Sequence, residues 1–257
     1  MQPLEKFERL IEIMAMLRSE SGCPWDQEQT HKSLRQHLLE EAYEVIDAID
    51  NNDYDELAGE LGDLLLQVVF HAQMAAEAGY FTIDDVIEKI NEKLVRRHPH
   101  VFGDEVINTS AEQTIAWEKS KLHKEGKKSA IDGVPKQLPA LLRAYRMQGK
   151  AAAVGFDWPE VEPVWEKLNE EVDELKEAIH FGDPDKVEDE LGDLLFTIVN
   201  MSRFLRVNPE DALRSTIEKF ERRFKRVEGE LKKRGRTMSD SDLLEMDAIW
   251  NQIKSEE

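Results

Sequence analysis

Residues 170–195 open with Glu170-Glu171-Val172-Asp173-Glu174 and close with Glu190-Leu191-Gly192-Asp193-Leu194-Leu195. The same two motifs stand 130 residues earlier, as Glu40-Glu41-Ala42-Tyr43-Glu44 and Glu60-Leu61-Gly62-Asp63-Leu64-Leu65. Two motifs that recur in the same order and at the same separation indicate an internal repeat. The chain is therefore predicted to contain two copies of one unit.

The apolar residues around both motifs recur at spacings of three and four, the period of an amphipathic helix. Turn-forming residues at 51–53 and 181–184 predict tight turns between antiparallel helices. No segment shows the alternation of a strand, so the predicted class is all-α, with two tandem copies of a helical-bundle unit. Besides the helices around 34–49 and 57–69, helices are predicted near 4–20, 83–97, 111–123, 139–151, 161–181, 185–206, 209–234 and 240–254.

Polar segments divide this helical pattern into domains. The hydrophilic stretch 124–135 contains two glycines and three lysines and is predicted to be a linker. It would separate an N-terminal domain, 1–123, from a C-terminal domain, 136–257. Within the second domain, Asn208-Pro209 and Ser239 with Asp242 predict helix starts.

The composition excludes several classes of protein. Lys and Arg number 34 against 54 Asp and Glu, and the formal net charge of −20 repels phosphate, so we expect neither nucleic acid nor a membrane as partner. The charges among residues 1–17 argue against a secretory leader, and no apolar run approaches the roughly 18 residues that a membrane span needs. Cys23 is the single cysteine, so no intramolecular disulfide can form. A cytoplasmic location is expected.

The acidic motifs predict a metal site. Residues three or four apart on a helix share a face, and a short turn makes the two motif-bearing helices neighbours, so their carboxylates would meet across one groove. Carboxylates that close repel one another unless a divalent cation lies among them. All-carboxylate ligation favours Mg²⁺, with Mn²⁺ as a substitute, whereas zinc and di-iron sites would require His or Cys that these motifs lack.

A solvated helix face is the competing interpretation of a single acidic run. Two observations favour the metal site: the paired motifs occur twice, and Glu190 and Asp193 lie among apolar residues. Gly62 and Gly192, inside helices, further predict the close approach of another backbone or of a ligand. Residues 156–158, Phe-Asp-Trp, are equally compatible with pocket lining and with turn packing.

The motifs resemble those of the MazG-type nucleoside triphosphate pyrophosphohydrolases, within the all-α NTP pyrophosphatase superfamily. The resemblance covers essentially the whole chain and includes the runs at 22–26, 96–102 and 219–224. It implies hydrolysis of ribo- and deoxyribonucleoside triphosphates, over a broad range of bases, to monophosphates and pyrophosphate with Mg²⁺. It also implies a homodimer whose helices complete the bundle, and a C-terminal copy that carries the main activity. The implied metal ligands are Glu171, Glu174, Glu190 and Asp193, with Glu41, Glu44, Glu60 and Asp63 as their equivalents in the first copy.

Chemistry assigns further roles around these ligands. Bound metal would acidify a water for attack on the α-phosphorus, and a carboxylate that is not fully used as a ligand, here Glu170, would accept its proton. Cations would meet the phosphates, and Trp250 would stack on the base whatever its identity. The predicted nucleotide-binding residues are Lys167, Lys186, Lys219, Arg222, Arg223, Trp250 and Lys254. The Lys219 run and the Trp250–Lys254 pair recur in the first copy as Lys93 with Arg96-Arg97 and as Trp117 with Lys121.

Two alternatives stay open at this point. One is an enzyme of narrower range on the same scaffold, acting as a dUTPase or dCTPase. The other is an acidic helical adaptor without catalytic activity, which would keep a metal for structure or bind a protein partner. The second alternative gives no reason for two acidic motifs to recur in register.

Overall fold

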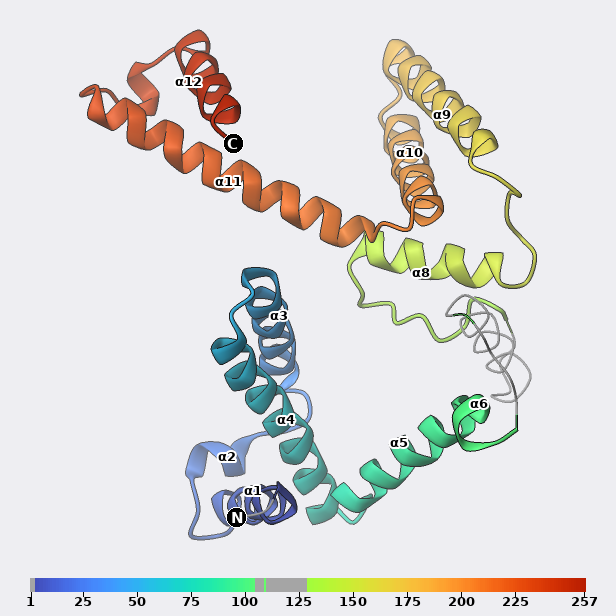
Figure 1. The fold of residues 1–257 in the computed structure, drawn as a ribbon, viewed down its shortest axis with the longest axis vertical. Helices are drawn as coiled ribbons and strands as arrows, with labels where there is room; N and C mark the ends of the chain where they lie inside the picture. Colours follow the sequence, from blue (N-terminus) through green and yellow to red (C-terminus); the bar gives the residue numbers. More distant parts are fainter. Residues whose placement is uncertain (1–2, 105–108, 110–128) are drawn as a thin grey trace. The chain divides into compact units, whose positions relative to one another are not determined.

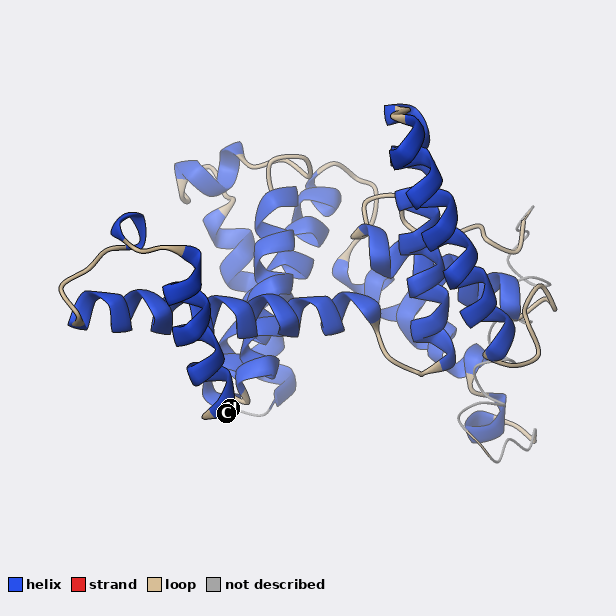
Figure 2. Cartoon of the chain, turned by 90° about the horizontal axis from the view of Figure 1, so that it is seen from above, coloured by secondary structure: helices blue, strands red, loops and turns tan. Residues whose placement is uncertain are grey.

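The computed structural model describes residues 3–104, 109 and 129–257. Within these residues every regular element is a helix, and Figure 2 shows helices joined by loops. The all-α prediction is confirmed. No helix in the described part of the chain combines the length and the apolar character needed to cross a membrane.

The chain divides into two compact units, Met1–Val106 and Ile107–Glu257. The helices of the first unit are α1 (Pro3–Leu17), α2 (Pro24–Glu28), α3 (Arg35–Asn51), α4 (Tyr54–Glu77), α5 (Ile83–Arg97) and α6 (Pro99–Phe102) (Figure 1). The second unit contains α8 (Ala140–Ala152), α9 (Glu162–Phe181), α10 (Pro184–Phe204), α11 (Pro209–Lys233), the 3₁₀ helix η1 (Met238–Asp240) and α12 (Leu243–Ser255). The helix predicted over 111–123, with Trp117 and Lys121, lies outside the described residues, as does part of the predicted linker 124–135. The predicted domain boundaries therefore stay a prediction.

Each unit is built around one helical hairpin, α3–α4 in the first and α9–α10 in the second. Asn52 and Gly182 end the leading helices in the left-handed conformation, with φ of 55° and 68°. The next residues, Asp53 and Asp183, cap the following helices, because each side chain accepts a hydrogen bond from the backbone N–H three residues on, at 3.0 and 3.3 Å. The two predicted turns are confirmed, and the same device sets the register of both hairpins.

A further helix packs on each hairpin. In the first unit α1 lies against α4, and in the second α8 lies against α10 while α11 pairs with α12. The buried core of the first unit comprises Met14, Leu34, Val69, Phe70 and Met74. The buried residues between α11 and α12 are Val227, Leu231, Ile249 and Ile253.

Local prediction misplaced one helix start and missed two short helices. Ser239 does not start the last helix; it lies in η1, and Asp242 is the cap, accepting a hydrogen bond from the Glu245 N–H at 2.8 Å. The short helices α2 and α6 were not predicted, because each starts at a proline and is too short to show a periodic apolar face. The ends of α5 and α9 agree with the sequence.

Arg18, just after α1, fastens this helix to α4. Its Nε donates to both carboxylate oxygens of Glu77 at 3.0 Å, and its guanidinium lies over the Phe70 ring at 5.5 Å from the centroid. The hydrogen bond from Arg18 lowers the pKa of Glu77 below its ordinary value. A carboxylate with a depressed folded-state pKa stabilises the fold above its unfolded-state pKa, and this contribution is lost as the pH falls through the folded-state value.

We therefore expect Glu77→Gln to lower the free energy of unfolding by about 0.5–1 kcal/mol at pH 7, where the ion pair is formed. The difference from wild type should shrink as the pH falls below about 4, the ordinary glutamate range. Urea unfolding followed by circular dichroism at pH 7 and at pH 3 measures it. Glu88→Gln, an exposed position in the same unit, is the control. A difference that is equal at both pH values would contradict a role of the ion pair.

Candidate metal and nucleotide site

The hairpin α9–α10 brings its acidic motifs together. Glu171, Glu174 and Glu190 each offer a carboxylate oxygen, and these oxygens all lie within 4.8 Å of one another. In the first unit a second triple is formed by Glu41, Glu60 and Asp63. Each hairpin thus places carboxylates from both of its motifs in one cluster.

The clusters differ from the predicted ligand sets in one member each. Asp193 is not part of the triple in the second unit, and Glu44 is not part of the triple in the first. Both lie on the same hairpins, and Asp193 lines an adjacent cavity. Their assignment as ligands stays a prediction.

Burial and like charge both act on the acids of the two clusters. Desolvation raises the pKa of Glu174 above its ordinary value, and the charges of Glu190 and Glu171 raise it further. Desolvation likewise raises the pKa of Glu41, with Asp63 and Glu44 adding to it, and the pKa of Glu60 is raised in the same way. A cation at either cluster would relieve this repulsion.

Among these acids, Glu171 gives the strongest evidence for a metal ion. It is 3% exposed, and its Oε1 pairs with Lys167 Nζ at 2.7 Å. Its Oε2 is buried without a hydrogen-bond partner in the described residues. A buried carboxylate oxygen without a partner is costly, and a divalent cation with carboxylate ligands would satisfy it. The residues therefore fit a hard divalent metal ion.

Lys167 lies one turn before the acids and bridges two of them. Its Nζ contacts Glu170 Oε1 at 2.8 Å as well as Glu171. The hydrogen bond to Glu170 is the larger cause, and that to Glu171 the next, of the raised pKa of the lysine. Glu170 is half exposed and stands outside the triple. The structure thus places the ammonium group of Lys167 beside the cluster. Glu170 lies at the edge of the cluster and faces solvent.

A cavity of about 630 Å³ opens beside the cluster of the second unit. This volume falls within the ~300–1,000 Å³ typical of small-molecule sites. Lys167, Glu171 and Asp193 line it near the acids. The rest of the lining comprises Ile131, Met147, Gln148, Ala151, Gly155, Phe156, Asp157, Trp158, Phe196, Thr197, Asn200 and Arg203.

The family comparison agrees with this arrangement. A model of the MazG nucleotide pyrophosphohydrolase domain matches residues 29–102 and 160–228, one stretch on each hairpin. The chain belongs to the MazG family. Membership confirms the resemblance, the duplicated domain and the prediction of a pyrophosphohydrolase.

Named relatives extend over nearly the whole chain. The nucleoside triphosphate pyrophosphohydrolase/pyrophosphatase MazG of Thermotoga maritima is 51% identical over 96% of this chain and 95% of its own. The nucleoside triphosphate pyrophosphohydrolase of Escherichia coli K12 is 47% identical over 99% of both chains. The uncharacterized protein YabN of Bacillus subtilis is 45% identical over 98% of this chain, which matches 52% of its length.

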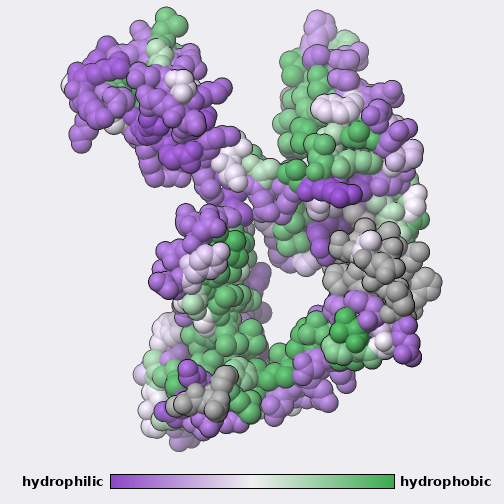
Figure 3. Space-filling view, in the orientation of Figure 1, coloured by the Kyte–Doolittle hydropathy of each residue, from purple (hydrophilic) through white to green (hydrophobic). Residues whose placement is uncertain are grey.

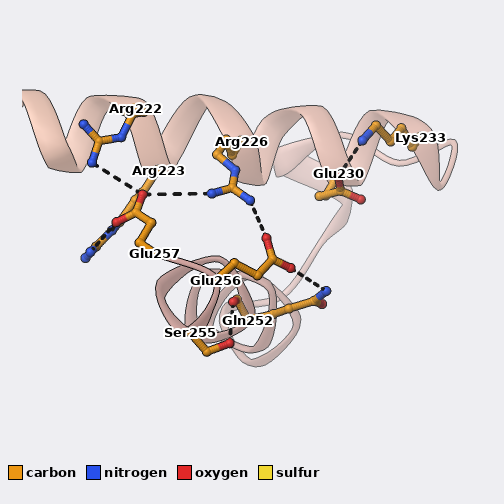
Figure 4. A network of polar contacts seen from close by, with 9 residues as sticks. All are labelled: Arg222, Arg223, Arg226, Glu230, Lys233, Gln252, Ser255, Glu256 and Glu257. Carbon is orange, nitrogen blue, oxygen red and sulfur yellow. Dashed lines mark hydrogen bonds and ion pairs between the residues drawn. The ribbon is translucent and has the colours of Figure 1, made fainter.

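The remaining predicted nucleotide ligands of this MazG chain lie away from the cavity lining. Arg222 and Arg223 on α11 both bind the carboxylate of Glu257, at 3.4 and 2.6 Å, in the network of Figure 4. Trp250 on α12 lies 5.3 Å from Phe220, centroid to centroid. None of these residues lines the cavity, and neither do Lys186, Lys219 and Lys254. Their role in nucleotide binding stays a prediction.

Two details of the site differ from the sequence analysis. Beyond the chain neighbours and the backbone of the same helix, no described atom lies within 4 Å of where a Cβ on Gly62 or Gly192 would stand, so the predicted close approach of another backbone is wrong within the described chain, and the close approach of a ligand stays a prediction. The Phe-Asp-Trp run at 156–158, left open between two roles, does line the cavity. Gln148 and Asn200 were missed, because a lone buried amide gives no signal in a single sequence.

The metal site makes a binding prediction. Glu171→Gln and Glu190→Gln should each lower the affinity of the MazG second unit for Mn²⁺ about tenfold or more, since each removes one anionic ligand. Electron paramagnetic resonance of free Mn²⁺ during titration measures this. The control is Asp173→Asn, an exposed position on α9 that pairs with Lys176. Unchanged binding in both glutamine variants, with helicity preserved, would refute the assignment.

Proposed function

We propose that this chain hydrolyses nucleoside triphosphates to nucleoside monophosphates and pyrophosphate in a Mg²⁺-dependent reaction, with the second unit as the main catalytic copy. The observation that carries the proposal is the buried, unpartnered Oε2 of Glu171, in a carboxylate triple that borders a cavity of nucleotide size. The names of the Thermotoga and Escherichia relatives support the activity. Cytoplasmic ribo- and deoxyribonucleotides are the proposed substrates.

Mg²⁺ is the proposed ion, with Mn²⁺ as a substitute. Glu171, Glu174, Glu190 and Asp193 would hold it. When bound, the ion neutralises charge on the triphosphate and increases the acidity of a water. Lys167 would remain beside Glu171 and add a fixed positive charge near the phosphates.

The proposed reaction is attack by water on the α-phosphorus. A bond forms between the water oxygen and this phosphorus, the bond to the bridging oxygen of pyrophosphate breaks, and the water proton passes to a carboxylate. Glu170 suits this last role, since it stands at the edge of the cluster, outside the carboxylate triple, and is half exposed to solvent. Pyrophosphate leaves with its charge neutralised by cations.

A second copy of the chain would complete the site. The hairpin leaves large apolar side chains half exposed, including Leu191, Leu195 and Ile198 at 46%, 47% and 45%. Figure 3 shows apolar surface over the α9–α10 pair. The apolar face of α10 is thus only partly covered by the rest of the described chain. A homodimer would cover this face and bring Lys219, Arg222 and Arg223 of one protomer to the acids of its partner.

The arginines are already arranged to bind an anion. The Glu257 carboxylate accepts hydrogen bonds from Arg223 Nε and Nη2 at 2.8 and 2.6 Å and from Arg222 Nη2 at 3.4 Å. A phosphate oxygen can replace a carboxylate oxygen at such a guanidinium pair. The triphosphate would therefore displace Glu257.

A nucleotide panel tests the proposed function. With Mg²⁺, we expect pyrophosphate and monophosphate from ATP, GTP, CTP, UTP and the deoxynucleotides, and ¹⁸O from labelled water in the monophosphate, because attack is at the α-phosphorus. Glu190→Gln should lower kcat at least 100-fold. Activity restricted to dUTP or dCTP would favour the narrower enzyme, and no product from any nucleotide would favour the adaptor. An undiminished rate in Glu190→Gln would place catalysis in the first unit.

Mixed dimers test the shared site. Glu190→Gln and Arg223→Ala should each be nearly inactive alone. Because each mixed dimer has one site that keeps both residues, an equimolar mixture should regain roughly a quarter of the wild-type rate after subunit exchange. Pyrophosphate release measures this, and a mixture of Glu190→Gln with Glu171→Gln is the matched control, since no site in it is intact. No recovery in the first mixture would contradict a site built from two protomers.

A further inference from the structure

The two carboxylate oxygens of Glu171 have different surroundings. Its Oε1 lies 2.7 Å from Lys167 Nζ, whereas its Oε2 is buried and has no hydrogen-bond partner in the part of the chain that the structure describes. Because the residue is only 3% exposed, bulk water does little to satisfy either oxygen. One oxygen is therefore held by a positive charge of the chain itself, and the other is left for a ligand of the cluster.

Lys167 is fixed in this position by two carboxylates. Besides Glu171, four residues later on α9, its Nζ contacts Glu170 Oε1, three residues later, at 2.8 Å. An ammonium group has hydrogen-bond donors and no acceptor, so it cannot coordinate a cation. Its charge also repels a cation from the oxygen that it holds. A metal ion in the cluster would therefore reach Glu171 through Oε2 alone.

Divalent cations differ in how they use a carboxylate. Ca²⁺ takes roughly six to eight oxygen ligands at about 2.3–2.6 Å and accepts both oxygens of one carboxylate. Mg²⁺ requires a nearly ideal octahedron at about 2.0–2.1 Å, and Mn²⁺ suits the same oxygen ligands. The two oxygens of one carboxylate lie too close together to fill two positions of such an octahedron. A carboxylate that offers one oxygen thus deprives Ca²⁺ of a ligand and still suits Mg²⁺.

The first unit has a different residue at the position of this lysine. His37 lies 130 residues before Lys167, and its Nδ1 pairs with Glu40, the counterpart of Glu170, at 3.2 Å. Glu41, the counterpart of Glu171, belongs to the first carboxylate triple. An imidazole is charged only when it is protonated, so His37 does not provide the permanent charge that a lysine provides. The two hairpins therefore offer an internal comparison of similar acids with and without the lysine.

We propose that Lys167 determines the metal selectivity of the second unit: by holding Oε1 of Glu171 it limits this carboxylate to one coordinating oxygen, and so favours Mg²⁺ and Mn²⁺ over Ca²⁺. The inference rests on the proposed function, since it concerns the ion of that site. Ligation through one oxygen also leaves positions of the ion for water and for phosphate oxygens, which Mg²⁺ sites in enzymes keep.

A simpler role for Lys167 gives a different expectation. If the lysine acted only through its charge, it would weaken the binding of every divalent cation. Ca²⁺ and Mn²⁺ carry the same charge, so removal of the lysine would then change both dissociation constants by about the same factor. The ratio of the two constants therefore separates selection from repulsion.

The test measures this ratio in the full-length chain. Glu41→Gln with Glu60→Gln removes the first-unit site, so that the titration reports the second unit alone. Free Mn²⁺ is followed by electron paramagnetic resonance, and Ca²⁺ is measured by its displacement of Mn²⁺. In this background Lys167→Met, which keeps the length of the side chain and removes its charge, should lower Kd for Ca²⁺ relative to Kd for Mn²⁺ about fivefold or more.

A matched control and a second variant accompany this measurement. Lys176→Met lies on the same helix and removes a lysine that pairs with the exposed Asp173 at 2.9 Å, so the ratio should stay as in the parent chain. Lys167→His gives the second unit the residue that the first unit carries at this position. It should lower the ratio in the same direction at pH 8, where the imidazole is neutral. It replaces Lys167→Met if circular dichroism shows that the methionine variant does not fold.

The outcomes distinguish this inference from the proposed function. A lower ratio in the Lys167 variant and an unchanged one in Lys176→Met support the selection. Equal changes of both dissociation constants, or no change in either, would overturn the selection and leave the proposed function standing. No binding of Mn²⁺ to the parent chain would overturn both. Selective binding of Mn²⁺ without hydrolysis of any triphosphate would overturn the proposed reaction alone.

Discussion

The repulsion among carboxylates held by one helical hairpin is the constraint on which this structure depends. Asp183 caps α10 directly after the left-handed Gly182, so the turn fixes which residues of α9 and α10 face one another. That register brings Glu171, Glu174 and Glu190 within 4.8 Å, where desolvation and their like charges raise the pKa of Glu174. Like charges held this close lower the stability of the fold, and a bound cation would offset this loss. The turn at Asn52-Asp53 repeats the arrangement in the first unit.

The features that could be predicted were those encoded by a local pattern in the sequence. The hairpins and their turns follow from apolar period and turn chemistry within some twenty residues, and the repeat itself pointed to the carboxylates. The cavity could not be predicted, because Ile131, Gln148 and Arg203 come from separate segments whose packing no local pattern encodes. The exposure of the apolar face of α10 could not be predicted for a related reason: the apolar period shows that Leu191 and Leu195 share a face, and it cannot show whether the chain itself covers that face.

The two units keep one carboxylate frame in different surroundings. Lys167 neutralises part of the charge beside Glu171, whereas the position 130 residues earlier is His37, which pairs with the exposed Glu40 at 3.2 Å. In the first unit Arg18, with its side chain 10% exposed, is fastened between Phe70 and Glu77. Because the Arg18 guanidinium is engaged by these two residues, it stabilises helix packing and does not serve to bind a ligand. The carboxylates of each hairpin thus set whether the unit can hold a cation. The side chains on neighbouring segments set what else the unit can bind.

The charge of the whole chain accounts for the number of positive groups in the proposed polyphosphate site. A net charge of −20 opposes the approach of a triphosphate, so binding requires positive groups placed where the phosphates will lie. In the proposed function, Arg222 and Arg223 would meet this need once their carboxylate partner, Glu257, gives way. An anion from the chain itself keeps these guanidinium groups paired without substrate, which limits the cost of gathering them, and a triphosphate carrying more charge than one carboxylate can displace it. In the proposed function the arginine cluster on α11 and the acid cluster on α9–α10 would bind opposite charges of one metal–triphosphate complex, and a second copy of the chain would bring the two clusters together.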